Sequence, residues 1–565
     1  MPTSTLSRPR LLAALHGPVT TERLNEALFA SKAEATVGDA DDLEVSVTPD
    51  RLDLLAEAGL AAHLDGALDL ARGPLPLRRA RASTASLRFA VDPSVSPLRP
   101  FLAGVVVRAP TGGGLDEGLL AEAVRFQELL HATVGRDRRA MSLGIYPARK
   151  LRSPIRYTLE PLDGVEFVPL GGSSRTPAGA FYAEHPYAQR FGPLGRTGDR
   201  CLTLRDARGT VLSLPPVLNS REAGEAAVGD RALLLESTGT RERAVRDGLG
   251  LLLVVFAARG WSVLPVPLVG PDGATPTRSG PLEPRTAELS MELARAVTGE
   301  PLTPSDLVAS LGRARLGARR VKGGVRVDVP PWRPDLLASV DLAEEVVLAR
   351  GLVADRALLP PSLGRGRRLP ATLFRREVAA LLLGLGFAQP NTTVLVAEAS
   401  AARLGPTGAI RLTNPVSREY AVVRDRLLTS HLDVLARNTR HGYPQRFAEV
   451  APVVVRLASA GGRAATRYHA GLVVAGEGAG FAEAAATVDY LLRAFDVGSV
   501  REPAEIPGTL PGRAAKVRVA GETVAELGEI DPRLLEELAV PVPAAWAEVD
   551  LAALGPLLAR RATPK

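Results

Sequence analysis

The segment PPWRPDLLASVDLAEEV, from Pro330 to Val346, determines how the rest of this chain is interpreted. After a rigid Pro-Pro step it gathers the carboxylates of Asp335, Asp341, Glu344 and Glu345. On a helix, residues at i, i+3 and i+4 share one face, so Asp341, Glu344 and Glu345 would crowd like charges there. A helix N-terminus, a basic partner or a bound cation relieves such crowding.

Spacing alone leaves two interpretations of this acidic segment open. Acids are common in the first turn of a helix because they complement its dipole, and Arg333 or Arg350 could neutralise part of the charge. Carboxylate oxygens are also the ligands that a hard ion such as Mg2+ prefers. By itself, the spacing favours a solvated acidic helix start over a metal site.

Length and composition indicate an intracellular protein of several domains. At 565 residues the chain is too long for a single core, and its 46% hydrophobic and 23% charged residues are typical of globular proteins. The single cysteine, Cys201, excludes an intrachain disulfide and a cysteine-cluster zinc site. The net charge of +7 is compatible with a polyanionic partner.

No segment predicts secretion or membrane insertion. The first residues lack a continuous apolar core of signal-peptide length. The most apolar run, 249–257, is too short to span a bilayer. We therefore expect a cytoplasmic protein with no membrane partner.

Changes in pattern along the chain predict an α+β multidomain protein. We expect a small mixed N-terminal domain at 1–83, an α+β domain at 84–280, a small module at 281–357, and helices on a mainly antiparallel sheet at 366–565. The helix–strand–helix pattern of the small module is typical of winged or DNA-binding-like modules. Gly/Pro/Arg-rich linkers are predicted at 72–81, 270–284 and 360–370.

Apolar periodicity predicts individual elements within these domains. Helices are expected at 21–31, 52–63, 119–133, 241–258, 303–311, 373–385 and 426–438. An alternating pattern predicts one strand over 321–329, directly before the acidic segment.

Several further motifs follow one another in a recognisable order. They are VTPDRLDLL (47–55), SLPPVLNSREAG (213–224), STGT (237–240), the acidic segment, LTNPVSREYAVVRDRLLTSHLDVLARN (412–438) and YPQRFAEV (443–450). In this order the chain resembles the β subunits of phenylalanyl-tRNA synthetases, of the shorter archaeal and eukaryotic type. The resemblance covers nearly the whole sequence.

This resemblance implies one subunit of a ligase. The family works as an (αβ)2 heterotetramer that charges tRNA(Phe) with phenylalanine at the expense of ATP, with the synthetic active site on the α chain. The β chain supports the assembly, helps to hold tRNA and hydrolyses mischarged Tyr-tRNA(Phe). The resemblance also implies Mg2+ at Asp335, Asp341, Glu344 and Glu345.

The same resemblance assigns an editing pocket to Leu204, Ser213, Glu236 and Thr238. A pocket that hydrogen-bonds the tyrosine hydroxyl rejects phenylalanine, which would leave buried polar groups unpaired. Relatives commonly carry Asp at the position of Glu236, and Pro147 departs from the family's GI[YH]D pattern. Without the resemblance, these residues would be read as ordinary strand hydrogen bonds and a surface ion pair.

The C-terminal domain, 366–565, resembles a class II synthetase core without its catalytic motifs. Arg424 stands where the second motif's arginine is expected, but Arg426 replaces the acidic partner, and nothing after Arg513 resembles GxGxxR. The ATP phosphates would therefore lack their arginine clamp. We expect Arg424 to form a structural ion pair with Glu449.

Two other functions remain alternatives at this point. One is a non-enzymatic paralogue that binds tRNA or a partner protein, and the other is a free-standing aminoacyl-tRNA deacylase. His131 is expected to be a packing or surface residue on a helix, and His185 lies in a polar loop that could contact the tRNA end. Arg136, Arg138 and Arg139 would form a solvated basic face.

Overall fold

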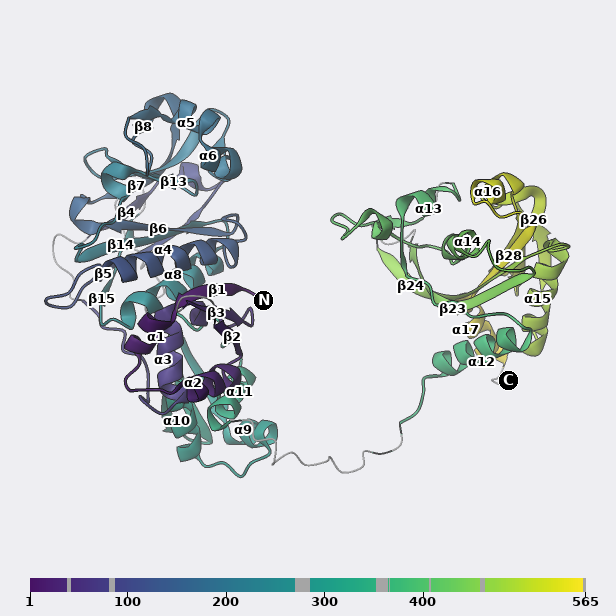
Figure 1. Cartoon of the computed structure of the whole chain (residues 1–565), viewed down its shortest axis with the longest axis horizontal. Coiled ribbons are helices and arrows are strands. Elements are labelled where there is room, and N and C mark those ends of the chain that lie inside the picture. Colours follow the sequence, from purple (N-terminus) through teal and green to yellow (C-terminus); the bar gives the residue numbers. More distant parts are fainter. Residues whose placement is uncertain are drawn as a thin grey trace. The chain divides into compact units, whose positions relative to one another are not determined.

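A computed structural model of the chain describes residues 1–37, 42–80, 87–269, 285–351, 364, 366–405, 408–457 and 463–561. These residues form two compact units, Met1–Leu358 and Leu359–Lys565 (Figure 1). The predicted domain boundaries at 83, 280 and 357, the linker at 270–284 and part of the linker at 360–370 lie outside the described residues. Among the described helices, none combines the length and apolarity needed to cross a bilayer.

The N-terminal part of the first unit is a three-stranded antiparallel sheet with helices, in the order β1-β3-β2. Its elements are β1 (Thr3–Ser7), α1 (Arg8–Ala14), α2 (Thr21–Ala30), β2 (Ala33–Val37), β3 (Asp42–Val47), the 3-10 turn η1 (Leu52–Leu55) and α3 (Glu57–Ala67). The α2 prediction is confirmed, with the Thr20 side chain accepting a hydrogen bond from the Arg23 amide. The helix predicted at 52–63 is split instead, because Ala56 has an extended backbone between η1 and α3.

Two sheets form the centre of the first unit. The first has the strand order β15-β5-β14-β6, and the second has the order β13-β12-β11-β7-β4-β16, with β10 paired to β11. Their strands are β4 (Phe89–Val91), β5 (Phe101–Arg108), β6 (Met141–Pro147), β7 (Ile155–Pro161), β10 (Arg196–Thr197), β11 (Arg200–Arg205), β12 (Val211–Leu214), β13 (Leu218–Asn219), β14 (Ala232–Gly239), β15 (Ser262–Pro265) and β16 (Leu268–Val269). The pair β8 (Glu166–Phe167) and β9 (Thr176–Pro177) forms a separate small sheet.

Helices α4 (Glu117–Ala132) and α8 (Glu242–Ala257) lie against the first of these sheets (Figure 1). Both were predicted from their apolar periodicity. One hydrophobic core joins them to the N-terminal sheet and reaches Trp332, so the N-terminal and α+β regions are packed on each other. Short helices complete this region at α5 (Ala178–Glu184), α6 (Pro186–Phe191) and α7 (Arg221–Gly224).

The small module of the first unit contains the acidic segment. Its sheet has the order β17-β19-β18, with its own hydrophobic core. The elements are β17 (Arg285–Ser290), α9 (Met291–Thr298), α10 (Pro304–Arg313), β18 (Gly317–Val321), β19 (Gly324–Val329) and α11 (Ser339–Arg350). The strand predicted at 321–329 is confirmed over Gly324–Val329, whereas Val321 ends the preceding strand β18, because Gly323 takes a positive φ of 83° and turns the chain.

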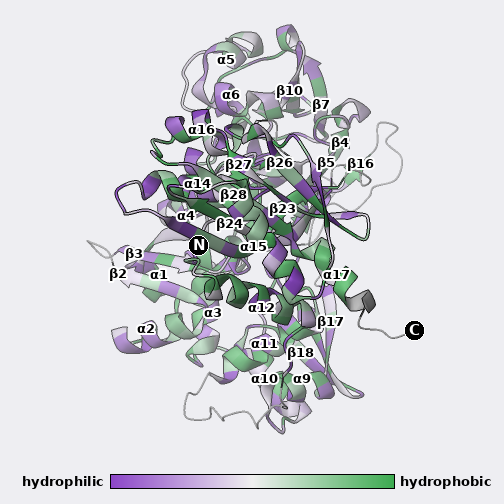
Figure 2. Cartoon of the chain, turned by 90° about the vertical axis from the view of Figure 1, so that its right-hand side faces the viewer, coloured by the Kyte–Doolittle hydropathy of each residue, from purple (hydrophilic) through white to green (hydrophobic). Residues whose placement is uncertain are grey.

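The second unit is built on a six-stranded antiparallel sheet in the order β23-β24-β28-β27-β26-β25. Its strands, several of which are seen in Figure 2 to carry both hydrophobic and hydrophilic residues, are β23 (Gln445–Arg456), β24 (Ala464–Ala475), β25 (Val500–Pro503), β26 (Thr509–Val519), β27 (Glu522–Ile530) and β28 (Ala544–Asp550). Helices α12 (Pro370–Gly384), α15 (Phe481–Ala494) and α17 (Leu551–Arg561) share a core with one face, and α14 (Leu428–Arg437) and α16 (Pro532–Glu537) with the other. A small sheet of β20 (Leu395–Val396), β22 (Val422–Val423) and β21 (Ile410–Arg411) and helix α13 (Glu398–Ala402) complete it.

Candidate functional site

A cavity of about 530 Å³ lies in the first unit, where its two large sheets meet. Its walls come from α4, β6, β12, β14 and the loop that follows β12. Two residues of the predicted pocket, Ser213 on β12 and Glu236 on β14, line it together. The fold therefore brings these two side chains into one cavity although they belong to different sheets.

Tyr146 on β6 joins these two residues. Its hydroxyl donates to Oε2 of Glu236 at 3.0 Å, and it lies 2.9 Å from Oγ of Ser213. Glu236 stands between Gly104 and Gly144 on the neighbouring strands, so no side chain on β5 or β6 flanks it directly. The other oxygen of the carboxylate, Oε1, is buried and has no hydrogen-bond partner among the described residues.

The carboxyl of Glu236 is buried in a setting that favours its neutral form. Burial raises its pKa from 4.5 to about 7, although the Tyr146 hydrogen bond, the charge of Arg99 and the Thr238 hydroxyl favour ionisation. Arg99 is buried as well, and burial lowers its pKa to about 10. A carboxyl that titrates near neutrality in a cavity is typical of functional sites.

The other two predicted pocket residues lie outside the residues that line the cavity. Oγ1 of Thr238 accepts from Nε of Arg99 at 3.3 Å and lies 3.2 Å from Oγ of Ser142. Leu204 pairs with Ser213 between β11 and β12 and is fully buried in the core of the second sheet. Thr238 and Leu204 therefore support the walls that carry Glu236 and Ser213.

Sequence reasoning missed two arginines that organise this region. Arg99 donates to the Thr238 and Arg138 carbonyl oxygens at 2.8 and 2.9 Å. Arg138 was expected on a solvated face, but it is 7% exposed and donates to the carboxylate of Glu128 and the carbonyl oxygen of Val217. No local pattern marks either residue, because their partners are distant in sequence.

The two histidines have structural roles among the described residues. His131 is buried on α4, which is the packing alternative, and its Nε2 accepts from the Leu143 amide at 2.8 Å; it also lines the 530 Å³ cavity. His185 precedes α6 and accepts from the Tyr187 amide at 3.2 Å.

The acidic segment takes part in a buried ion-pair network with the VTPDRLDLL motif. Arg333 donates to Asp335 at 2.7 Å and to Glu345 at 2.6 Å. Arg51 donates to Asp53 at 3.0 Å and lies 3.7 Å from Glu345. All five side chains are at most 7% exposed. Arg333 thus neutralises part of the acidic segment, as one of the two interpretations predicted. Through Arg51, the network also connects the small module to the N-terminal region.

The remaining two acids of the segment have other partners. Asp341 accepts from the amides of Leu337 and Ala338 at 2.7 Å at the start of α11, and Glu344 lies 2.9 Å from Nζ of Lys32. In the part of the chain that the structure describes, no three His, Cys, Asp or Glu side chains are grouped to hold a metal ion. As placed, the segment does not fit a single Mg2+, which would have to displace Arg333 or Lys32.

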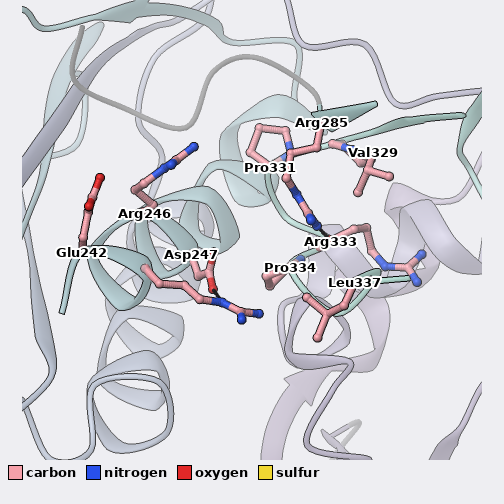
Figure 3. Close-up of a pocket in the computed structure, with 11 residues that line it drawn as sticks. Glu242, Arg246, Asp247, Arg285, Val329, Pro331, Arg333, Pro334 and Leu337 are labelled. Atoms are coloured by element: carbon pink, nitrogen blue, oxygen red, sulfur yellow. Dashed lines mark hydrogen bonds and ion pairs between the residues drawn. The ribbon is translucent and has the colours of Figure 1, made fainter. Parts of the chain in front are cut away.

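A second cavity, of about 390 Å³, separates the start of α8 from the turn before α11. Figure 3 shows Arg246 and Asp247 on α8 facing Arg285 and Pro331 across it. Arginines outnumber acids along its wall, and the four acids of the acidic segment are not part of that wall.

The side chain of Arg424 in the second unit forms an ion pair and hydrogen bonds with other residues of that unit. Its side chain is fully buried, with Nη1 3.9 Å from Oε2 of Glu449. The guanidinium also donates to Oγ of Ser430 at 2.9 Å and to the Pro452 carbonyl oxygen at 3.2 Å. The expected ion pair with Glu449 is thus confirmed, and hydrogen bonds supplement it.

Burial of Glu236 is expected to make stability depend on pH. Because its folded-state pKa of about 7 lies above the ordinary 4.5, the folded chain keeps a proton that the unfolded chain has lost. The contribution of Glu236 to stability is greatest at low pH and falls by about 3 kcal/mol as pH rises through that window. We expect Glu236→Gln to remove this fall, as measured by urea unfolding at about pH 5 and pH 8. An equal effect of the substitution at both pH values would contradict the raised pKa.

Comparisons with known proteins assign two regions of the chain to known domain families. Residues 287–352 match the tRNA synthetase B5 domain, and residues 357–551 match the phenylalanyl tRNA synthetase beta chain CLM domain. A solved N-terminal fragment of the phenylalanyl-tRNA synthetase β subunit of Pyrococcus horikoshii has a similar fold. The TM-score is 0.57 at 22% identity, covering 62% of this chain and 99% of the fragment.

Curated relatives match over almost the full length. The phenylalanine–tRNA ligase β subunit of Korarchaeum cryptofilum is 30% identical, covering 98% of each chain. That of Aeropyrum pernix is 32% identical, covering 98% of this chain and 99% of the relative. With these matches, the chain belongs to the phenylalanyl-tRNA synthetase β-subunit family.

Proposed function

We propose that this chain is the β subunit of a phenylalanine–tRNA ligase, joining an α chain in an (αβ)2 heterotetramer that charges tRNA(Phe) using phenylalanine, ATP and Mg2+. The near full-length match to curated β subunits supports this role. In this arrangement the α chain holds the synthetic active site in the cytoplasm, and the present chain contributes architecture and tRNA contacts.

The folds that we propose for the regions 281–357 and 366–565 are consistent with synthesis taking place on the α chain. We infer that 366–565 is a class II synthetase-like core without catalytic function and that 281–357 is a winged or DNA-binding-like module. The antiparallel sheet of the second unit favours the first reading. Because Arg424 is buried and already bonded to Glu449, Ser430 and Pro452, it is not available to clamp nucleotide phosphates.

Editing of Tyr-tRNA(Phe) is the second activity that we propose, and we place it in the cavity lined by Ser213 and Glu236. The observation that carries it is the buried Oε1 of Glu236, which lacks a partner among the described residues. A bound tyrosine would donate its hydroxyl to this oxygen, whereas phenylalanine would leave it unpaired at a cost of about 1–3 kcal/mol or more. Thr238 and Leu204 support the walls of the same pocket.

Co-expression with an α chain tests the division between the subunits. We expect the isolated chain to form no aminoacyl-adenylate and the purified complex to charge tRNA(Phe), measured by pyrophosphate exchange and by aminoacylation. Size-exclusion chromatography with light scattering reports the stoichiometry. Adenylate formation by the isolated chain would contradict the proposal.

The resemblance implies a magnesium site at Asp335, Asp341, Glu344 and Glu345, but the ion pairs that three of these acids form in the structure favour a segment without the metal. Because Arg333 and Lys32 already pair with these acids, we expect the Tm of the isolated chain to be the same in Mg2+ and in EDTA. A rise of several degrees in Mg2+ that Glu344→Gln abolishes would instead establish a metal site in this segment.

A further inference from the structure

We infer that Tyr146 is a positioning residue for Glu236: its phenol holds one carboxylate oxygen in place, so that the other stays free to receive the hydroxyl of a bound tyrosine. The inference rests on the proposed editing function and adds a residue that determines its specificity.

The lack of a side chain at Gly144, two residues earlier on β6, makes room for the Tyr146 ring. Gly144 lies directly opposite Glu236 in the pairing of β6 with β14. A Cβ atom at position 144 would lie 2.3 Å from the Tyr146 hydroxyl and 2.6 Å from its ring, which real contacts do not allow. The glycine thus leaves the space through which the ring reaches Glu236. The ring is also 1% exposed and packed in the core of the second sheet, so the phenol is held rigidly.

The hydrogen bonds through Tyr146 have a defined direction when Glu236 is ionised. A phenol has one proton, and the ionised carboxylate can only accept, so the Tyr146 proton goes to Oε2. The Ser213 hydroxyl must then donate to the phenol oxygen, 2.9 Å away. This series of hydrogen bonds ends on Oε2, and Oε1 stays without a hydrogen-bond partner among the described residues. Ser213 therefore acts through Tyr146 on the carboxylate.

Substituting different neighbours of Glu236 distinguishes a positioning role of Tyr146 from a purely structural one. Arg99 and Thr238 also favour its ionised form, and Tyr157 lies close enough to interact with it electrostatically. Tyr146 donates directly to Oε2 at 3.0 Å. Removing that donor should make ionisation of Glu236 harder, whereas removing the Tyr157 hydroxyl, which donates to the Arg99 carbonyl oxygen, should not.

The test compares wild type with Tyr146→Phe, and with Tyr157→Phe as a matched control that also removes one buried phenol. In the complex with the α chain, Tyr-tRNA(Phe) deacylation is measured against pH. We expect Tyr146→Phe to move the midpoint upward by about one to two pH units, with about 10-fold less activity near neutrality. Gly144→Ala, which displaces the ring, should shift the profile in the same direction, and Tyr157→Phe should leave it unchanged.

A second readout needs no substrate. Infrared titration of the isolated chain follows the band of the buried protonated carboxyl, identified by its loss in Glu236→Gln, and the Tyr146→Phe midpoint should again move upward. If wild type fails to deacylate Tyr-tRNA(Phe), the proposed editing function fails, yet this titration still tests the positioning role. An unchanged midpoint in both readouts would overturn the inference. Faster deacylation by Tyr146→Phe would also overturn it, because the phenol would then be blocking the pocket.

Discussion

Replacing Glu236 with alanine is expected to lower the preference of the complex for Tyr-tRNA(Phe) over Phe-tRNA(Phe) by about 100-fold, equivalent to about 3 kcal/mol. The carboxylate is the buried acceptor of the cavity, with Oε2 held by Tyr146 and Oε1 unpartnered among the described residues. Without it, the substrate hydroxyl would be buried with no charged acceptor, while phenylalanine would lose nothing. Single-turnover deacylation of each aminoacyl-tRNA measures the ratio.

Two variants sharpen this experiment. Glu225 lines the same cavity but its side chain is 49% exposed, so Glu225→Gln should leave the ratio unchanged. Glu236→Asp keeps a carboxylate and should retain most of the preference. If Glu236→Ala and Glu225→Gln behaved alike, recognition of the hydroxyl would lie elsewhere.

Replacing Arg333 with methionine is expected to lower the free energy of unfolding of the first unit by about 3–5 kcal/mol. The guanidinium is 3% exposed and pairs with both Asp335 and Glu345. Its removal leaves two buried carboxylates without their main partner, and burial makes an uncompensated charge costly. Trp261 and Trp332 lie in the core of the same unit, so their fluorescence during urea unfolding reports the change.

A matched substitution in the same module provides the control. Arg326 pairs with Glu288 at 2.8 Å on the exposed face of β19 and β17. Exposed pairs contribute about 0–1 kcal/mol, so Arg326→Met should change stability little. Equal effects of Arg333→Met and Arg326→Met would show that the buried network does not fasten the module.

Much of the local structure was predictable, and the failures have local causes. Helices α4 and α8 were predicted correctly from their apolar periodicity, because residues that recur at helical spacing form the face that packs on the core. The prediction at 52–63 was wrong where Ala56 leaves helical geometry, and the one at 321–329 where Gly323 forms a turn. Both interruptions are single residues within otherwise regular patterns.

The candidate site was only partly predictable, because its contacts depend on strand register. The resemblance pointed to Ser213 and Glu236, which the fold places in one cavity. The role of Tyr146 follows from Gly144 standing opposite Glu236, a pairing that no local pattern specifies. Likewise, the sequence marked the acids near Arg333, but not that Arg51 from a distant motif would join them.

Selective editing is tested most directly by the rates at which the wild-type complex hydrolyses Tyr-tRNA(Phe) and Phe-tRNA(Phe) in the same single-turnover experiment. We expect hydrolysis of the tyrosyl ester at least about 100-fold faster than that of the phenylalanyl ester, at a pH of about 8 where Glu236 is ionised. Equal rates for the two esters, or rates no faster than hydrolysis without protein, would contradict it.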